Sequence, residues 1–178
     1  FFIRYYSSFA APGENIAMPE HSAKFDYESE LTIVMGTTVR NASAEEGLAA
    51  VFGYTVAMDG SVRDYQKRTH QWTLGKNFDD SGSIGPWIVS ANELPSGAKG
   101  LGVQARVNGE LLQDGNTGDM IFSIGELVAA LTECMTLHPG DVILTGTPAG
   151  VGPLQPGDQV AVTVEGIGTL TNPVVAEN

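Results

Sequence analysis

Two glutamates stand two residues apart at the start of an apolar segment, in YESELTIVMG, residues 27–36. Side chains i and i+2 of a β-strand point to the same face, so Glu28 and Glu30 are predicted to lie side by side. Two carboxylates at that spacing repel each other, and burial would raise the pKa of each. A bound cation would relieve both effects, and so would exposure to water.

A third carboxylate, Asp59, ends the apolar segment GYTVAM and precedes Gly60. Strand ends that open into loops often carry functional side chains, although Asp-Gly is also a common turn pair. Taken together with Glu28 and Glu30, Asp59 completes an oxygen-only donor set without cysteines or paired histidines. Such a set suits Mg²⁺, Mn²⁺ or Ca²⁺ rather than Zn²⁺ or copper. An α-keto acid could supply two further oxygens to such an ion.

Lys76 is the basic residue with the clearest chemical potential. It lies between turn residues in TLGKNF, in a chain with only nine lysines and arginines. An ammonium beside a metal-bound substrate could stabilise a developing enolate, but a solvated surface lysine is the alternative. The histidines His21, His70 and His138 are scattered, and Cys134 lies in an apolar helical pattern that predicts a buried thiol.

The elements that must position these residues are mostly strands. Ser43 with Glu46 and Ser123 with Glu126 each have the spacing of a capping box, and a shorter helix is expected to start at Ser61. Asn108-Gly109 predicts a type I′ hairpin turn. Strands are predicted over residues 2–5, 29–35, 53–58, 86–90, 102–107, 110–113, 141–144, 159–164 and 168–172. Strands outnumber helices without strict alternation, which favours a mainly β or α+β fold.

Composition narrows the class of partner. The chain has 178 residues, expected to form one domain over 1–178, and a formal net charge of −12. That charge argues against nucleic acid or an acidic membrane surface as a partner. No run of 18 apolar residues and no signal peptide is visible, so a cytoplasmic protein that does not enter membranes is expected.

Several stretches in order resemble the fumarylacetoacetate hydrolase (FAH) family. They extend over nearly the whole chain and comprise FFIRYYSSF, DYESEL, GYTVAMDGSVRDYQ, LGKNF, GPWIVSANEL, VNGELLQ, LHPGDVILTGTPAGVG and GDQVAVTVEGIGTL. The resemblance implies a compact, mainly β roll of mixed sheets with a few short helices. It also implies a homodimer and a small keto-acid substrate.

The resemblance also implies roles for individual residues. The family's Glu-x-Glu pair and downstream aspartate, which bind Mg²⁺ or Mn²⁺, correspond to Glu28, Glu30 and Asp59. By the same correspondence Lys76 is a catalytic candidate, and Arg63, Gln66 and Thr147 are candidates for substrate contact. Arg63 and Gln66 are one helical turn apart and can share a face.

This sequence departs from the common family pattern in two places. Arg4-Tyr5 stands where many members have Lys-Pro, and MDGSVRD replaces a frequent Asn-Asp-Val-Ser. Both changes are expected to affect the substrate side more than the metal ligands.

The function expected from the resemblance is divalent-metal-dependent hydrolysis of a carbon–carbon bond in an acylpyruvate or related β-diketo acid, through a metal-bound enolate. Alternatives are an oxaloacetate-type decarboxylase, a hydroxymuconate-type isomerase, or a non-catalytic metal-binding β-roll.

A base that activates water is expected outside these residues. Many family members carry a His-Glu pair for this purpose on a segment ahead of the region that begins here at Phe1. The base is therefore expected on an N-terminal lid preceding Phe1, with His21 as the first candidate within the chain.

Overall fold

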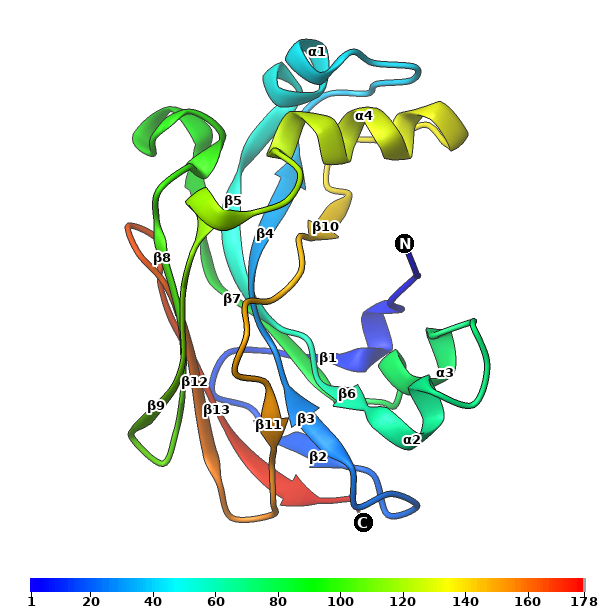
Figure 1. The fold of residues 1–178 in the computed structure, drawn as a ribbon, viewed down its shortest axis with the longest axis vertical. Helices are drawn as coiled ribbons and strands as arrows, with labels where there is room; N and C mark the ends of the chain where they lie inside the picture. The colour runs from blue at the N-terminus through cyan, green and yellow to red at the C-terminus, as the bar shows by residue number, and fades with distance from the viewer. Residues whose placement is uncertain (178) are drawn as a thin grey trace.

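The computed structural model describes residues 1–177, which form two facing five-stranded sheets and a small third sheet (Figure 1). The first sheet has the strand order β1 (Phe9–Ala10), β7 (Gly82–Ser90), β5 (Val51–Met58), β4 (Ser29–Met35) and β10 (Val142–Leu144). The second has the order β2 (Ile16–Met18), β13 (Gly168–Ala176), β12 (Gln159–Val164), β8 (Gly102–Val107) and β9 (Glu110–Asn116). The third has the order β11 (Gly152–Pro153), β3 (Phe25–Tyr27) and β6 (Ser61–Val62).

The sheets are mixed, and their apolar faces meet in one core. The pairs β1–β7 and β2–β13 are parallel, and the other pairs are antiparallel. Side chains such as Leu31 and Val56 from the first sheet and Val160 and Val162 from the second belong to the same buried cluster. Every residue of β4 is buried, as expected for a central strand with both faces covered. The predicted mainly β roll with a few short helices is therefore confirmed.

Within residues 1–177, four short α-helices lie in two pairs. The helices α1 (Ala44–Ala49) and α4 (Ile124–Cys134) pack together at one end of the sheets. The helices α2 (Arg63–Gln66) and α3 (Thr73–Lys76) pack together beside β6, away from α1 and α4 (Figure 1). No helix in the described part of the chain is both long and apolar enough to span a membrane.

Local sequence signals are mostly confirmed. Both capping boxes form, and Asn108 and Gly109 have φ values of 52° and 87°, as a type I′ turn between β8 and β9 requires. The strands predicted over 29–35, 102–107 and 159–164 have the bounds observed. The strands β1, β2, β3, β6 and β11, each of two or three residues, were not predicted.

Three expectations are wrong. Residues 2–5 form no strand; instead the Asn77 side chain bonds to the backbone of Ile3 and Tyr5, and a 3₁₀ turn follows. The expected helix at Ser61 begins at Arg63, because residues 61–62 pair with β3 as β6. Cys134 is exposed, because it is the last residue of α4 and lies outside the buried face of that helix.

Candidate metal and substrate site

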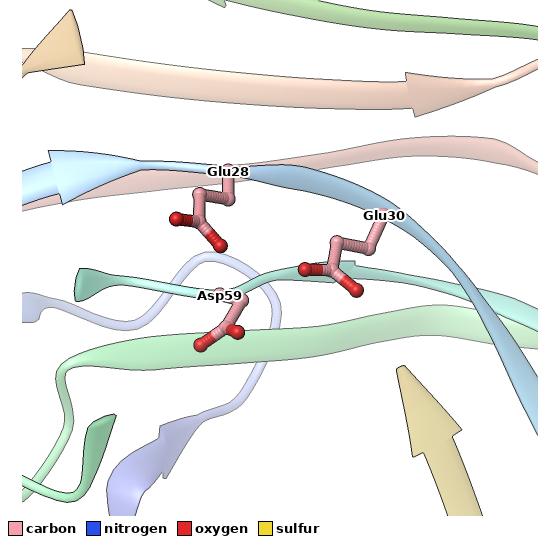
Figure 2. A group of neighbouring side chains, drawn as sticks. All are labelled: Glu28, Glu30 and Asp59. Carbon is pink, nitrogen blue, oxygen red and sulfur yellow. The ribbon is translucent and has the colours of Figure 1, made fainter. Parts of the chain in front are cut away.

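The antiparallel register of β4 and β5 brings three carboxylates together. Ser29 pairs with Met58, and one step further the Asp59 N–H donates to the Glu28 carbonyl at 2.9 Å. The end of β5 therefore lies beside the start of β4. In Figure 2, Glu28 and Glu30 project from the same side of their strand toward Asp59. One carboxylate oxygen from each residue lies within 4.8 Å of the others, and the residues are 7%, 3% and 1% exposed.

Gly60 allows the chain to turn sharply after Asp59. A Cβ atom at this position would lie 1.7 Å from the Ser81 carbonyl oxygen and 2.7 Å from the Phe25 ring. No side chain fits there without moving backbone. The glycine thus lets the chain after Asp59 pack directly against Phe25 of β3 and against the residue that precedes β7.

Burial among like charges dominates the chemistry of Glu30. Burial, followed by repulsion from Asp59 and Glu28, raises the pKa of Glu30 to about 8. The Gly146 N–H, which donates to Glu30 Oε2 at 2.5 Å, and the Lys76 ammonium act in the opposite direction. The remaining repulsion is the kind of strain that a cation between the carboxylates would relieve.

Three side-chain cations face the three carboxylates. The Lys76 Nζ lies 2.9 Å from Glu28 Oε2 and 2.7 Å from Asp59 Oδ2, and Lys76 is only 2% exposed. The Arg63 Nη1 lies 2.6 Å from Glu28 Oε1, and the Arg4 Nη1 pairs with Asp59 Oδ1. Lys76 is thus a buried residue of this cluster, and the solvated-surface alternative is wrong.

Arg63 is held in its charged form by its neighbours. Burial opposes its charge, yet hydrogen bonds and charges from Asp26 and Glu28 outweigh this effect and raise the pKa of the guanidinium. Its Nε donates to Asp26 Oδ2 at 2.7 Å, and its Nη1 donates to Gln66 Oε1 at 3.1 Å. Arg63 and Gln66 therefore lie together, as their spacing predicted.

Arg4 is a site residue whose place the sequence did not reveal. Its five N–H groups have five acceptors: Asp59, the Gly60 carbonyl, the Ser8 hydroxyl and carbonyl, and the Ser81 hydroxyl. The guanidinium also lies 4.5 Å from the centre of the Phe9 ring. The departure from Lys-Pro at this position therefore touches a carboxylate of the cluster, whereas an effect on the substrate side was expected.

A loop after β10 closes the cluster from another side. The Thr145 N–H and hydroxyl donate to the Leu31 carbonyl, and the Thr147 hydroxyl donates to the Ser29 carbonyl at 2.9 Å. Gln113, a fully buried residue of β9, supports this arrangement from the second sheet. It accepts from the Ser29 N–H and donates to Thr147 Oγ1 and the Pro148 carbonyl. No local sequence signal distinguishes Gln113 from an ordinary strand residue.

The cluster opens into a cavity of about 610 Å³. The structure brings all seven candidate residues to this cavity, and Phe2, Trp72 and His70 also line it. His21, the expected candidate within the chain, is not among the lining residues. The lining residues are Phe2, Glu28, Glu30, Asp59, Arg63, Gln66, Lys67, Thr69, His70, Trp72, Lys76, Leu144, Gly146 and Thr147.

The donor set fits a hard divalent ion. Glu28, Glu30 and Asp59 offer only carboxylate oxygens, and their ligand atoms already converge. Three protein oxygens leave coordination positions open for substrate oxygens and water, an arrangement that Mg²⁺ and Mn²⁺ commonly adopt. The buried triad could therefore hold such an ion.

Comparisons with known proteins identify relatives that are similar in sequence and fold. A crystal structure of 2-hydroxyhepta-2,4-diene-1,7-dioate isomerase from Mycobacterium marinum superposes with a TM-score of 0.94 at 41% identity, covering 99% of this chain and 69% of that one. A maleylpyruvate hydrolase from Aquipseudomonas alcaligenes is 41% identical over 96% of this chain and 58% of its own length. An oxaloacetate tautomerase from Xenopus laevis is 42% identical over 98% of this chain and 57% of its own length.

The chain thus spans less than two thirds of the length of the maleylpyruvate hydrolase and of the oxaloacetate tautomerase. These two relatives are named for different reactions. The family model described as fumarylacetoacetate (FAA) hydrolase C-terminal matches residues 1–175. Because this match covers almost every residue, the chain belongs to the fumarylacetoacetate hydrolase family.

Proposed function

We propose that this chain catalyses divalent-metal-dependent hydrolysis of a carbon–carbon bond in an acylpyruvate or related β-diketo acid. The observation that carries the proposal is the buried carboxylate triad, which opens into a cavity lined by Arg63, Gln66 and Lys76. The maleylpyruvate hydrolase among its relatives supports the hydrolytic reaction. The non-catalytic alternative does not explain why these side chains gather around the triad.

The reaction requires charge to be stabilised on one half of the substrate. The oxygen of water bonds to the acyl carbonyl carbon, the bond from that carbon to the methylene breaks, and the electron pair moves into the pyruvoyl half as an enolate. The enolate then takes a proton, giving a carboxylate and pyruvate. A divalent ion, which Glu28, Glu30 and Asp59 would hold, would supply Lewis-acid polarisation of the keto oxygen.

The chain's own residues supply positioning and charge. Lys76 places an ammonium at the edge of the triad, where it can stabilise the enolate oxygen. Arg63 has a second role open to it, since its guanidinium faces the cavity and can bind the substrate carboxylate. Gln66 accepts from Arg63 through Oε1, which leaves its amide N–H groups as donors toward the substrate.

The Thr147 hydroxyl can contribute less to substrate binding than a free hydroxyl, because it already makes two hydrogen bonds within the protein. It donates to the Ser29 carbonyl and accepts from Gln113, which leaves one acceptor position for a substrate group. Its main contribution is therefore to hold the loop that carries Gly146 against Glu30.

Water activation has a candidate within the described residues. His70 lines the cavity, and a well-placed base accelerates such a step by about 10²- to 10⁴-fold. A His-Glu pair on a segment preceding Phe1 stays a prediction. If His70 is the base, His70→Gln should lower hydrolysis, whereas His21→Gln, outside the cavity lining, should not. Unchanged hydrolysis in both variants would favour a base outside the described residues.

A second candidate is enolate chemistry on oxaloacetate, namely decarboxylation or keto–enol exchange. The oxaloacetate tautomerase among the relatives favours it, and the same triad and Lys76 would serve, because neither reaction needs attacking water. Isomerisation of a hydroxymuconate-type acid, favoured by the Mycobacterium marinum neighbour, would use the same enolate.

A substrate panel tests these proposals. Acylpyruvates of increasing acyl length, oxaloacetate and a hydroxymuconate-type acid are assayed with Mg²⁺, with Mn²⁺ and with chelator. Metal-dependent release of pyruvate from an acylpyruvate supports the hydrolase. Turnover of oxaloacetate alone would replace it with the second candidate, and metal binding without turnover of any compound would contradict both.

A further inference from the structure

Each carboxylate of the triad has one oxygen engaged by a group other than Lys76. Arg63 Nη1 holds Glu28 Oε1, Arg4 Nη1 holds Asp59 Oδ1, and the Gly146 N–H holds Glu30 Oε2. One oxygen per residue remains for a further ligand: Glu28 Oε2, Asp59 Oδ2 and Glu30 Oε1. A monodentate tripod of this kind is a suitable set of protein ligands for a small divalent ion.

Lys76 contacts two of these three remaining oxygens. Its Nζ lies 2.9 Å from Glu28 Oε2 and 2.7 Å from Asp59 Oδ2. An ion bound by the tripod would need the same two oxygens, and an ammonium at hydrogen-bond distance from both would lie within a few ångströms of the ion. Like charges so close inside a buried site repel strongly.

We propose, on the basis of the function proposed above, that Lys76 competes with the divalent ion for Glu28 and Asp59, and that ion binding releases its ammonium toward the substrate. The Lys76 side chain then has two roles in sequence. It first neutralises the carboxylates, and it becomes available to the substrate oxygen only when the ion has taken its place.

The surroundings of Lys76 provide a position for the released ammonium. The Phe2 ring centre lies 5.0 Å from Nζ, and Phe2 and Lys76 both line the cavity. An ammonium over an aromatic face is favourable, and that attraction persists when the carboxylates are taken by the ion. A shift of the ammonium toward the cavity therefore keeps its contact with Phe2 while the ion takes the two carboxylate oxygens.

Calorimetry of Mg²⁺ binding without substrate tests the competition. Lys76→Met removes the charge and keeps an apolar stem of similar length, so Mg²⁺ should bind at least about tenfold more tightly than to the wild type. Lys99→Met makes the same charge change at an exposed residue outside the cavity, and it should alter the affinity by less than about twofold. Equal or weaker Mg²⁺ binding by Lys76→Met would overturn the proposal.

Thermal unfolding of the same variants adds an independent measurement. In chelator Lys76→Met should melt below the wild type, because three buried carboxylates lose a counter-charge. The rise in Tm on adding Mg²⁺ should then be larger for Lys76→Met than for the wild type or Lys99→Met. Equal rises in all three proteins would contradict the competition.

The wild type itself provides a test that does not depend on a variant folding. The chain has four lysines, so ¹³Cε-lysine labelling gives four side-chain NMR signals. Mg²⁺ should move one of them strongly, and the signal lost in Lys76→Gln identifies it. An unmoved Lys76 signal at saturating Mg²⁺ refutes the release. If the wild type binds neither Mg²⁺ nor Mn²⁺, the proposed function fails as well, whereas normal binding with an unmoved signal removes only the Lys76 competition.

Discussion

The pair α1 and α4 begins on complete capping boxes, whereas α2 and α3 begin on Val62 and Trp72, neither of which makes a side-chain cap. In α1, Ser43 exchanges two hydrogen bonds with Glu46, and in α4, Ser123 exchanges three with Glu126. The helices α2 and α3 have four residues each, too few to be stable alone, and they carry Arg63, Gln66 and Lys76.

This difference shows where each helix pair gets its stability. The first pair is specified by neighbouring residues in the sequence. The second is held by contacts with distant residues, such as Lys76 with Glu28 and Asn77 with Ile3. The ion pairs of Arg63 and Lys76 hold α2 and α3 in place, and the same two side chains are the ones proposed to contact the substrate, so substitutions in this helix pair should affect chemistry and structure together.

The largest expected effect is on catalysis by Lys76→Met. If its ammonium stabilises the enolate, kcat should fall by about 10²- to 10³-fold, with a smaller rise in KM. Steady-state kinetics at saturating Mg²⁺ checks this. An unaltered kcat would mean that Lys76 only stabilises α3 and neutralises the carboxylates. The two helix pairs would then differ in how they are stabilised, but Lys76 would give α3 no part in catalysis.

The next effect is on metal affinity. Glu30→Gln keeps the size of the side chain and removes its charge, so Mg²⁺ affinity should fall at least about 100-fold. In chelator the variant should melt higher than the wild type.

The pKa of Glu30 is raised from 4.5 to about 8 in the folded protein, so the wild type loses stability as the pH rises from about 4.5 to about 8. Glu30→Gln has no such ionisation, and the difference in Tm between the variant and the wild type should therefore grow over that pH range. Unchanged Mg²⁺ binding in both Glu28→Gln and Glu30→Gln would remove the metal assignment.

Gly75→Ala sets helix propensity against tertiary packing within α3. Propensity favours alanine by about 1 kcal/mol. A Cβ atom at Gly75, however, would lie 2.5 Å from the Gln66 backbone nitrogen. We expect a lower Tm and a loss of about tenfold or more in kcat/KM, since Lys76 follows directly. Gly102→Ala, where the nearest atom is 3.5 Å away, is the control. A higher Tm in Gly75→Ala would show that local propensity governs this helix pair too.

The smallest effect is expected at the capped helices. Ser123→Ala removes one half of the α4 capping box and should cost about 1 kcal/mol of unfolding free energy, or about 2–4 °C in Tm. Mg²⁺ affinity and kcat should stay unchanged, because α4 contributes no residue to the cavity of the site. A loss of activity at a temperature where the variant is fully folded would show that the stability of α4 influences the site residues on α2 and α3.

The same contrast explains what the sequence could predict. Capping boxes, the Asn108-Gly109 turn and strand β4 depend on residues within a few positions of one another, and all were predicted. Arg4 and Gln113 reach the site through contacts between residues far apart in the chain, namely Arg4 with Asp59 and Gln113 with Ser29. No local pattern marks such residues.

The candidate carboxylates could be selected because their spacing has a physical meaning on a strand. Glu28 and Glu30 had to share a face, and Asp59 was the next acidic strand end. What the sequence could not supply was the register of β4 and β5, which places Asp59 opposite Glu28. For residues 2–5 the local pattern was misleading. The pattern suits a strand, but the backbone of this segment bonds to the Asn77 side chain instead of to another strand.

The matched charges of the site leave the rest of the molecule strongly acidic. Three of the nine basic residues face three of the 21 acidic ones at the cluster, so the whole net charge of −12 lies outside it. A divalent cation is drawn toward such a surface, whereas a keto-acid anion must approach against its field. Raising the ionic strength from about 0.01 M to 0.2 M shortens the Debye length from about 30 Å to less than 10 Å. At saturating Mg²⁺ the encounter rate with an anionic substrate, measured as kcat/KM, should therefore rise with added salt.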